Sequence, residues 1–199
     1  MTSRVHVLGV CGSIGSGKSV VMQLLHFYGI PIYIADERAK MRYYDPDVRQ
    51  AIQEKWGVDV IDEGGQLRKS LLMEILRRST TDKEQLEEIV HSSLAKDFRQ
   101  WVDAQKSPWV ALESAILFTS GFYKLCDTTL YVTASHKTRK DRVMRRDGDT
   151  TSERFSTFDA VQRVEAEQAL QSSRILHNDR NSSLIHQVED LLMGGTSLF

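Results

Sequence analysis

Residues Gly12–Ser19 read G-S-I-G-S-G-K-S and fit the pattern G-x-x-x-x-G-K-[ST]. An apolar run, 5–10, precedes this stretch, and a segment with helical spacing, 20–25, follows it. In a strand–turn–helix setting, glycines let successive backbone N–H groups point inward around phosphate oxygens, and the helix adds its positive end. The stretch therefore predicts a phosphate-binding loop (P-loop) for a nucleoside triphosphate.

Two side chains of the P-loop have specific roles in this motif. Lys18 reaches the β- and γ-phosphates, and the Ser19 hydroxyl ligates Mg²⁺. Ser19 is therefore the predicted metal ligand. The predicted nucleotide-binding set comprises the loop and the residue after it: Gly12, Ser13, Ile14, Gly15, Ser16, Gly17, Lys18, Ser19 and Val20.

The composition favours one domain, with or without a small inserted subdomain, because the chain has 199 residues and 41% of them are hydrophobic. A formal net charge of −1 gives no general reason to expect nucleic acid or a membrane as a partner. Cys11 and Cys126 are too few for a disulfide framework or a metal cluster. The start of the sequence lacks the apolar core of a signal peptide, and no apolar run is long enough to span a bilayer. We therefore expect a cytoplasmic protein.

Short apolar runs alternate with longer segments of helical period along the chain, which is typical of an α/β fold. Strands are predicted at about residues 4–10, 31–35, 108–113, 128–133 and 174–177. We expect these strands to form a five-stranded parallel sheet flanked by helices, the three-layer architecture of P-loop nucleoside-triphosphate hydrolases.

Helices are predicted between and after these strands. The first covers Ser19 to Tyr28 and ends at Gly29, and another covers Pro46–Trp56. A long helix at about 82–105 has a clear 3.6-residue apolar repeat, and the last helix, 182–193, is amphipathic. The stretch from about 37 to 106 predicts a helical, acceptor-binding excursion within a single domain, 1–199.

Asp36 is predicted to end the second strand and to lie beside the P-loop strand. In an open parallel sheet the reactive crevice lies outside the carboxyl ends of the strands. A carboxylate there can accept a proton from an attacking hydroxyl or bind a Mg²⁺-coordinated water. Asp is equally suited to be the N-cap of a helix beginning at Glu37, and the residues alone leave both interpretations open.

Glu113 closes the apolar strand predicted at Trp109–Glu113. An apolar strand that ends in an acid resembles the second nucleotide motif of P-loop enzymes, in which the acid helps to hold the metal. An ordinary acid at a strand end fits the same pattern, so both interpretations of Glu113 stay open.

Basic residues crowd the segment after the fourth predicted strand: Arg139, Lys140, Arg142, Arg145 and Arg146. On a helix, Arg139, Arg142 and Arg146 share a face. Arginines of a mobile lid stabilise the charge that phosphoryl transfer spreads over oxygen atoms. A solvated basic face is the alternative, but the P-loop in the same chain favours a lid, predicted at about 136–172.

Two further patterns are less informative. Asp62–Gly65 fits the D-x-x-G pattern of GTPases, but the chain has no N-K-x-D element for reading guanine. His91 lies on the long predicted helix, where it either contacts substrate or has a structural role. The six histidines show no zinc-binding spacing.

Together these motifs resemble the dephospho-CoA kinase family, whose members phosphorylate the ribose 3′-hydroxyl of dephospho-CoA. The likeness runs from about Val5 to Val188 and begins with the P-loop run G-V-C-G-S-I-G-S-G-K-S. P-I-Y-I-A-D at Pro31–Asp36 is similar to the family's V-I-D-A-D, and Gly65–Lys69 is similar to its G-x-L-x-R.

Other segments extend the resemblance. Ile89–Ser92 is similar to the family's I/L-x-H-P, and Glu113–Phe118 falls on an acid-then-P-L-L-F/V-E stretch that helps to form its acceptor site. Asn178 fits the asparagine of V-I-x-N-x-G near the adenine. The residues that fit the family's lid motif, Q/R-x-x-R-x-x-x-R-D, are Arg139, Arg142, Arg146 and Asp147.

The resemblance implies ATP and Mg²⁺ as cofactors and dephospho-CoA as the small-molecule substrate, in the last step of coenzyme A biosynthesis. It adds Arg142 and Asn178 to the nucleotide-binding set. The implied catalytic residues are Asp36 as the general base, Lys18, Arg142 and Arg146. The implied substrate-binding residues are Asp36, Lys69, His91, Glu113, Ile116, Leu117 and Phe118. We expect a monomer or a weak homo-oligomer, with neither nucleic acid nor a membrane as a partner.

The sequence departs from the family pattern in the acceptor segments and in the lid. Ile34, Lys69 and Ser92 replace an acid, an arginine and a proline, and Ala115 and Thr119 replace the proline and final acid of the acceptor stretch. The lid's R-I-x-x-Q and following lysine become Phe158, Gln162 and Gln168, or in another register include Arg163 and Gln168. The alternative functions are a different small-molecule or nucleotide kinase and a nucleotide-binding regulator without transferase activity.

Overall fold

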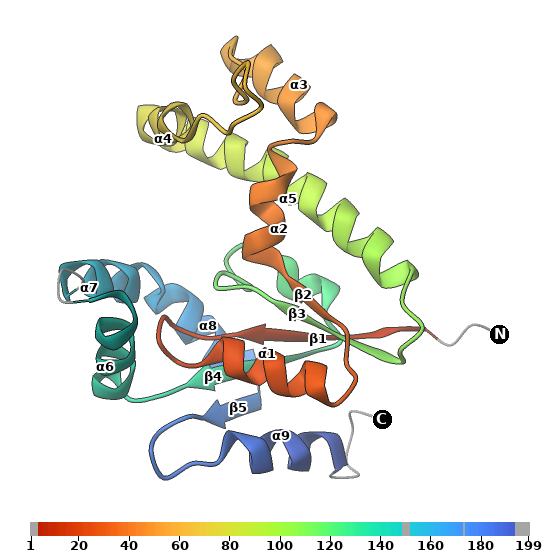
Figure 1. The fold of residues 1–199 in the computed structure, drawn as a ribbon, viewed down its shortest axis with the longest axis vertical. Coiled ribbons are helices and arrows are strands. Elements are labelled where there is room, and N and C mark those ends of the chain that lie inside the picture. The colour runs from red at the N-terminus through yellow and green to blue at the C-terminus, as the bar shows by residue number, and fades with distance from the viewer. Residues whose placement is uncertain (1–3, 149–151, 173, 194–199) are drawn as a thin grey trace. The chain divides into compact units, whose positions relative to one another are not determined.

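The computed structural model describes residues 4–148, 152–172 and 174–193. The chain divides into two compact units, one formed by Met1–Ile34 with Gln105–Phe199 and the other by Ala35–Ala104. Figure 1 follows the chain through these units from red at the N-terminus to blue at the C-terminus. Residues 149–151 of the predicted lid lie outside the described residues, as do the two ends of the predicted domain.

The first unit is built on a five-stranded parallel sheet with the order β2-β3-β1-β4-β5. Its strands are β1 (His6–Cys11), β2 (Ile32–Ile34), β3 (Trp109–Glu113), β4 (Thr128–Thr133) and β5 (Arg174–His177). The central strands are apolar and buried because helices cover both faces of a parallel sheet. The predicted parallel sheet and α/β class are confirmed.

The strand order corrects two expectations about Asp36. β3, not β2, pairs with β1, because the connection through the first helix skips one position that β3 then fills. β2 ends at Ile34, and Asp36 lies in the first turn of α2 (Ala35–Arg42), neither at the strand end nor at an N-cap. The charged residues from Asp36 onward favour a helix over a strand, and Asp36 and Glu37 complement the positive end of that helix.

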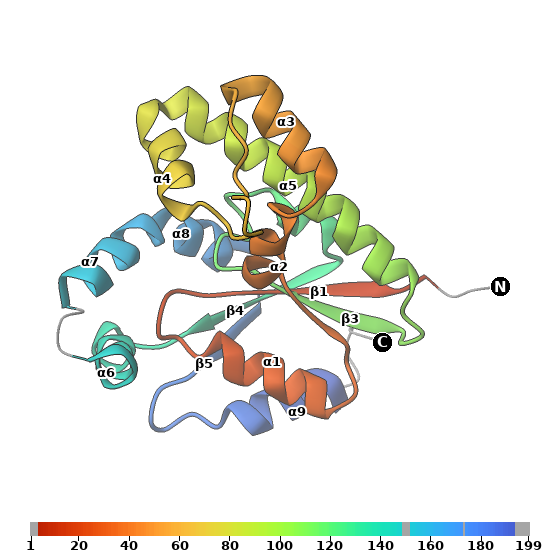
Figure 2. The ribbon, with the colours of Figure 1, turned by 45° about the horizontal axis from the view of Figure 1, so that its top comes forward.

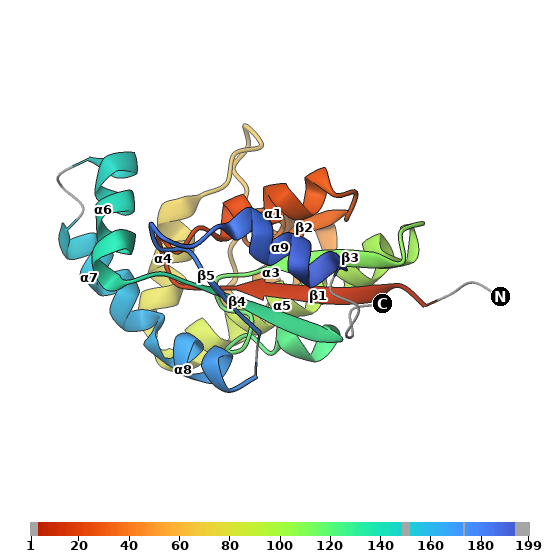
Figure 3. The ribbon, with the colours of Figure 1, turned by 90° about the horizontal axis from the view of Figure 1, so that it is seen from below.

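Helices cover both faces of the sheet, as Figure 3 shows from the edge. α1 (Lys18–Phe27) and α9 (Leu184–Met193) lie side by side on one face, and α8 (Arg163–Ser172) packs against β4 on the other. The core between the sheet and α1 and α9 includes Leu8 and Leu25. Full burial of one such side chain stabilises the fold by about 1.5–3 kcal/mol. The interior of the first unit therefore fixes the strand that leads into the P-loop.

A buried phenylalanine joins the first two helices after β4. They are α6 (His136–Asp147) and α7 (Ser152–Val161). The Phe155 and His136 rings pack in a T-shaped arrangement with 5.2 Å between centroids, and the Phe155 ring centroid lies 5.7 Å from the Arg139 guanidinium carbon. This small packing centre holds α7 against the basic helix α6.

The second unit consists mainly of α2, α3 (Pro46–Trp56), α4 (Lys69–Arg78) and α5 (Thr80–Asp103), with α3 and α4 packed along α5 (Figure 2). It has its own apolar core, which includes Ile52, Ile75 and Leu86. The predictions of α3 and of a long α5 are confirmed, while α4 was missed although its leucines already have helical spacing. No helix in the described ranges is both long and apolar enough to span a membrane.

Candidate active site

The P-loop turns tightly between β1 and α1, and its glycines approach neighbouring backbone closely. Gly12 and Gly15 have φ angles of 155° and 76°. A Cβ atom would lie 2.4 Å from the Val132 carbonyl oxygen at Gly12 and 2.5 Å from the Arg139 carbonyl oxygen at Gly15. These positions therefore require glycine, and the close packing holds the loop in one shape.

The donors around this loop fit phosphate and Mg²⁺. The first N–H groups of α1 have no acceptor within the helix, and the positive end of the helix favours an anion there. Ser16 Oγ is fully buried and, among the described residues, has no hydrogen-bond partner. The Ser19 side chain is exposed in the first turn of α1, and its hydroxyl oxygen is a hard ligand of the kind that Mg²⁺ prefers. The residues present thus fit a metal-bound triphosphate.

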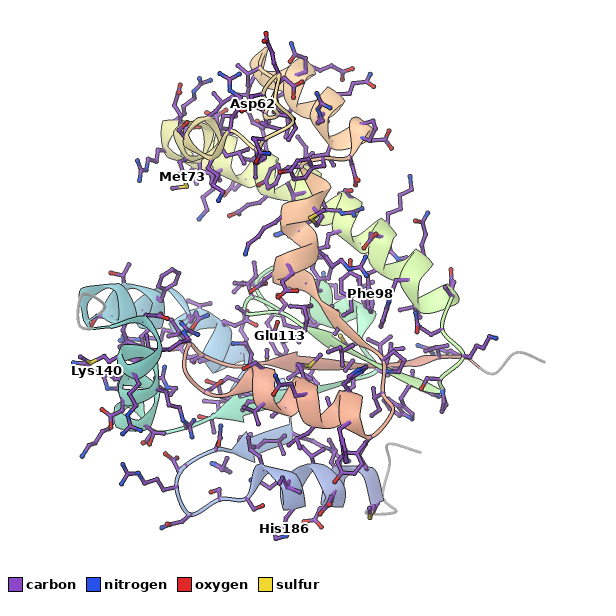
Figure 4. All side chains as sticks on the ribbon, in the orientation of Figure 1. Asp62, Met73, Phe98, Glu113, Lys140 and His186 are labelled. Atoms are coloured by element: carbon purple, nitrogen blue, oxygen red, sulfur yellow. The ribbon has the colours of Figure 1, made fainter. Side chains whose placement is uncertain are left out.

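Lys18 contacts oxygen atoms of the P-loop and of β3. Its ammonium group donates to the Gly12 carbonyl oxygen at 2.7 Å and lies 3.8 Å from the Glu113 carboxylate. Glu113 is buried at the carboxyl end of β3, where Figure 4 labels it. The pairing of β3 with β1 therefore brings together the predicted acid and the predicted phosphate-binding lysine.

Two of the three arginines predicted to share a helix face contact the P-loop. Arg139 and Arg142 each donate to carbonyl oxygens of the loop, at 3.3–3.4 Å. Arg146 lies one turn further along α6, is mostly exposed and pairs with Asp147 at 2.6 Å. The structure brings Arg139 and Arg142 to the P-loop, and the assignment of Arg142 and Arg146 to catalysis stays a prediction.

Arg142 also contacts Asn178, the residue predicted to lie near the adenine. Its guanidinium group donates to the Asn178 backbone oxygen at 2.8 Å, and the Asn178 amide donates to a P-loop carbonyl oxygen at 2.8 Å. The adjacent Asp179 accepts hydrogen bonds from Thr138 and from the Ser135 amide, which lower the pKa of Asp179. These bonds join the start of α6 to the loop after β5 and so hold Arg142 and Asn178 together.

The residues on the altered lid motif have different surroundings. Gln162, between α7 and α8, accepts a hydrogen bond from the Ile14 amide of the P-loop at 2.7 Å. Phe158 and Gln168 are exposed. Of the residues that fall on this motif in the first register, Gln162 therefore has a contact with the nucleotide loop.

The predicted acceptor segment, Glu113–Phe118, continues from β3 within the first unit. The Ile116 side chain is 39% exposed, whereas Leu117 is fully buried and Phe118 stacks on Tyr123 with 5.2 Å between ring centroids. Leu117 and Phe118 anchor the segment by packing, and Ile116 presents an exposed apolar side chain. Their contact with an acceptor stays a prediction.

The other predicted acceptor residues belong to the second unit. Asp36 is exposed in the first turn of α2, and Lys69 is exposed at the start of α4. His91 is half-buried on α5, and burial lowers the pKa of this imidazole while nearby Glu87 acts in the opposite direction. A neutral imidazole both donates and accepts hydrogen bonds, which suits contact with a hydroxyl group.

Sequence reasoning missed one buried carboxylate of the first unit. Glu165 lies on α8 and is 3% exposed. It accepts hydrogen bonds from the amide of Phe118, the last residue of the predicted acceptor segment, and from the amide of the next residue, Thr119. Its spacing of four residues from the buried Ala169 is the sequence signal that could have placed it on the inner face of a helix.

Comparison with known proteins identifies the family. The family model for dephospho-CoA kinase matches residues 6–183. The chain belongs to the dephospho-CoA kinase family. The match includes the P-loop, the acceptor segment and the whole predicted lid, so the earlier resemblance is confirmed.

Individual relatives agree with this assignment. The chain is 45% identical to a dephospho-CoA kinase of Porphyromonas gingivalis over 144 residues, and this alignment covers 72% of this chain and 71% of that protein. It is 35% identical over 187 residues to a dephospho-CoA kinase of Bacteroides fragilis, with 93% and 90% covered. The crystal structure of TT1252 from Thermus thermophilus superposes with a TM-score of 0.76 at 25% identity and covers 96% of each chain.

Gly17→Ala tests the close approach of Asn178 to the P-loop. Gly17 has φ 100°, and a Cβ atom there would lie 2.1 Å from the Asn178 amide nitrogen. Backbone strain of about 1–3 kcal/mol and displacement of this amide are expected to weaken ATP binding about tenfold. Calorimetric titration with Mg·ATP measures the change in affinity.

Gly29→Ala is the matched control, because Gly29 has φ 84° but, apart from its chain neighbours, no atom of the described residues lies within 4 Å of its Cβ position. It should lower the melting temperature through the same backbone strain while leaving ATP affinity unchanged. Unchanged ATP affinity in Gly17→Ala would show that the Asn178 contact has no part in nucleotide binding.

Proposed function

We propose that this chain transfers the γ-phosphoryl group of ATP to the ribose 3′-hydroxyl of dephospho-CoA, which yields coenzyme A and ADP. The family match over residues 6–183 carries the proposal. The P-loop geometry supports the nucleotide half of the reaction, because a rigid glycine turn, a helix N-terminus and Lys18 converge there.

At the nucleotide end, the P-loop amides and Lys18 bind the β- and γ-phosphates, and Lys18 exchanges its bond to the Gly12 oxygen for phosphate oxygens. Ser19 would hold Mg²⁺, which when bound neutralises charge on the β- and γ-phosphate oxygens. Asn178 binds the adenine side of the nucleotide. Arg139 and Arg142 already donate hydrogen bonds beside the loop, so they need only exchange partners to contact phosphate.

At the acceptor end, Asp36 accepts the proton of the 3′-hydroxyl group while the oxygen of that hydroxyl group attacks the γ-phosphorus. The new ester bond forms as the bond between the γ-phosphorus and the bridging oxygen of ADP breaks. Lys69, His91 and the segment Glu113–Phe118 bind dephospho-CoA. Closure of the lid excludes water, which otherwise competes as the acceptor.

The direct test is ADP release from Mg·ATP with and without dephospho-CoA, with the product identified by its mass and by the 3′ position of the new phosphate. We expect ADP release to depend on dephospho-CoA and to match coenzyme A formed. Transfer to another member of an acceptor panel would indicate a different kinase. ATP binding without transfer to any acceptor would indicate a nucleotide-binding regulator.

A further inference from the structure

A buried carboxylate joins α8 to the loop that follows β3. One Glu165 oxygen accepts a hydrogen bond from the Phe118 amide at 2.8 Å. The other accepts from the Thr119 amide at 2.8 Å and from the Thr119 hydroxyl at 3.0 Å. A buried carboxylate is costly unless several donors satisfy it. For Glu165 these donors are the two amides and the hydroxyl group of the adjacent loop residues Phe118 and Thr119.

The backbone of this loop depends on Glu165. Other amides bond within the loop: that of Ser120 donates to the Ile116 oxygen and that of Gly121 to the Phe118 oxygen. The amides of Phe118 and Thr119 donate instead to the carboxylate of α8. Since a buried amide without an acceptor is unfavourable, the carboxylate fixes the backbone at the end of the acceptor segment.

The side chain at position 119 matches this arrangement. Thr119 stands where the family pattern has an acid, and its hydroxyl donates to Glu165. A carboxylate at position 119 could not donate this bond and would place a second negative charge beside Glu165. The short polar side chain of Thr119 is therefore complementary to the buried acid of α8.

We propose that Glu165 is a positioning residue that holds the segment Glu113–Phe118 in the conformation that binds the phosphoryl acceptor. The inference rests on the proposed function, because it takes dephospho-CoA as the acceptor. Glu165 acts through the loop backbone and not by contact with the reacting atoms. Its hydrogen bonds go to Phe118 and Thr119 and not to the P-loop, so we expect its effect to fall on the acceptor side of the reaction.

The test compares Glu165→Gln with Glu167→Gln in the full chain. Glutamine presents an NH₂ group toward one of the two loop amides and leaves that amide without an acceptor, whereas Glu167 is an exposed residue of the same helix and matches the loss of charge. We expect Glu165→Gln to raise the Kd and KM for dephospho-CoA about tenfold, with the Kd for Mg·ATP unchanged. Glu167→Gln should change neither.

Equal weakening of both ligands, or no change in dephospho-CoA affinity, would overturn the positioning role. If Glu165→Gln does not fold, Thr119→Val tests the same role, because it removes the hydrogen bond from the hydroxyl group and keeps the one from the backbone amide. We expect Thr119→Val to raise the Kd for dephospho-CoA about threefold and to leave the Kd for ATP unchanged. A Thr119→Val protein with unaltered acceptor affinity would then refute the role. If the wild-type chain does not bind dephospho-CoA, the proposed function is overturned and this role with it. If the wild-type chain binds dephospho-CoA and the variants bind it equally well, the role of Glu165 alone is overturned.

Discussion

Asp36→Asn is expected to lower kcat by about 10²–10⁴-fold while ATP binding is retained, because the amide keeps the size of the side chain but cannot accept a proton. Asp36 is exposed in the first turn of α2, so the substitution removes no core contact. Steady-state kinetics with dephospho-CoA and a separate titration with Mg·ATP measure the two effects. Equal turnover in the variant would remove Asp36 from the mechanism.

Glu37→Gln provides a matched control for this variant. Glu37 is the next residue, is also exposed in the first turn of α2, and loses the same charge by the same chemical change. Any loss of favourable interaction with the helix N-terminus is therefore common to both variants. Comparable loss of kcat in Glu37→Gln would attribute the effect to the charge of the helix end and not to proton transfer.

Lys18→Ala is expected to lower kcat by about 10²–10³-fold and also to weaken Mg·ATP binding, since the ammonium group binds phosphate in the ground state and in the transition state. In the structure this group bonds to the Gly12 oxygen and lies 3.8 Å from Glu113. Single-turnover kinetics and calorimetric titration with Mg·ATP separate the two losses.

Lys106→Ala controls for the change in net charge, because Lys106 is exposed and lies just before β3. It should leave kcat and the Kd for Mg·ATP unchanged. Melting temperatures of both variants show whether loss of the ammonium near the buried Glu113 also destabilises the fold. A Lys18→Ala variant with normal ATP affinity would contradict the predicted role of Lys18 in phosphate binding.

Local sequence patterns predicted most of the first unit. The runs 5–10 and Trp109–Glu113 are continuous and apolar, which is the pattern of a strand covered on both faces. Gly29 and Pro31 located the end of α1 because their backbone preferences act within a few residues. Such signals do not depend on distant contacts, so they can be read without the tertiary structure.

The second unit was harder to predict from the sequence. α4 has ten residues and follows a polar loop, and its apolar spacing was overlooked beside the longer pattern of α5. Asp36 was assigned to a strand end because the apolar run Ile32–Ala35 has no local marker that separates β2 from α2. Boundaries of this kind depend on which backbone groups pair in the sheet.

The sequence by itself determined the P-loop, the α/β class and the family resemblance. The glycines, Lys18 and Ser19 of the P-loop act at fixed local spacing, and the apolar patterns of strands and helices are likewise local. Only the tertiary structure decided that β3 lies beside β1 and brings Glu113 to Lys18. It also decided which residues of the predicted lid contact loops elsewhere in the first unit, including Glu165 with the loop at Thr119. These contacts join residues far apart in the chain, and strand order and helix packing, not local propensity, select them.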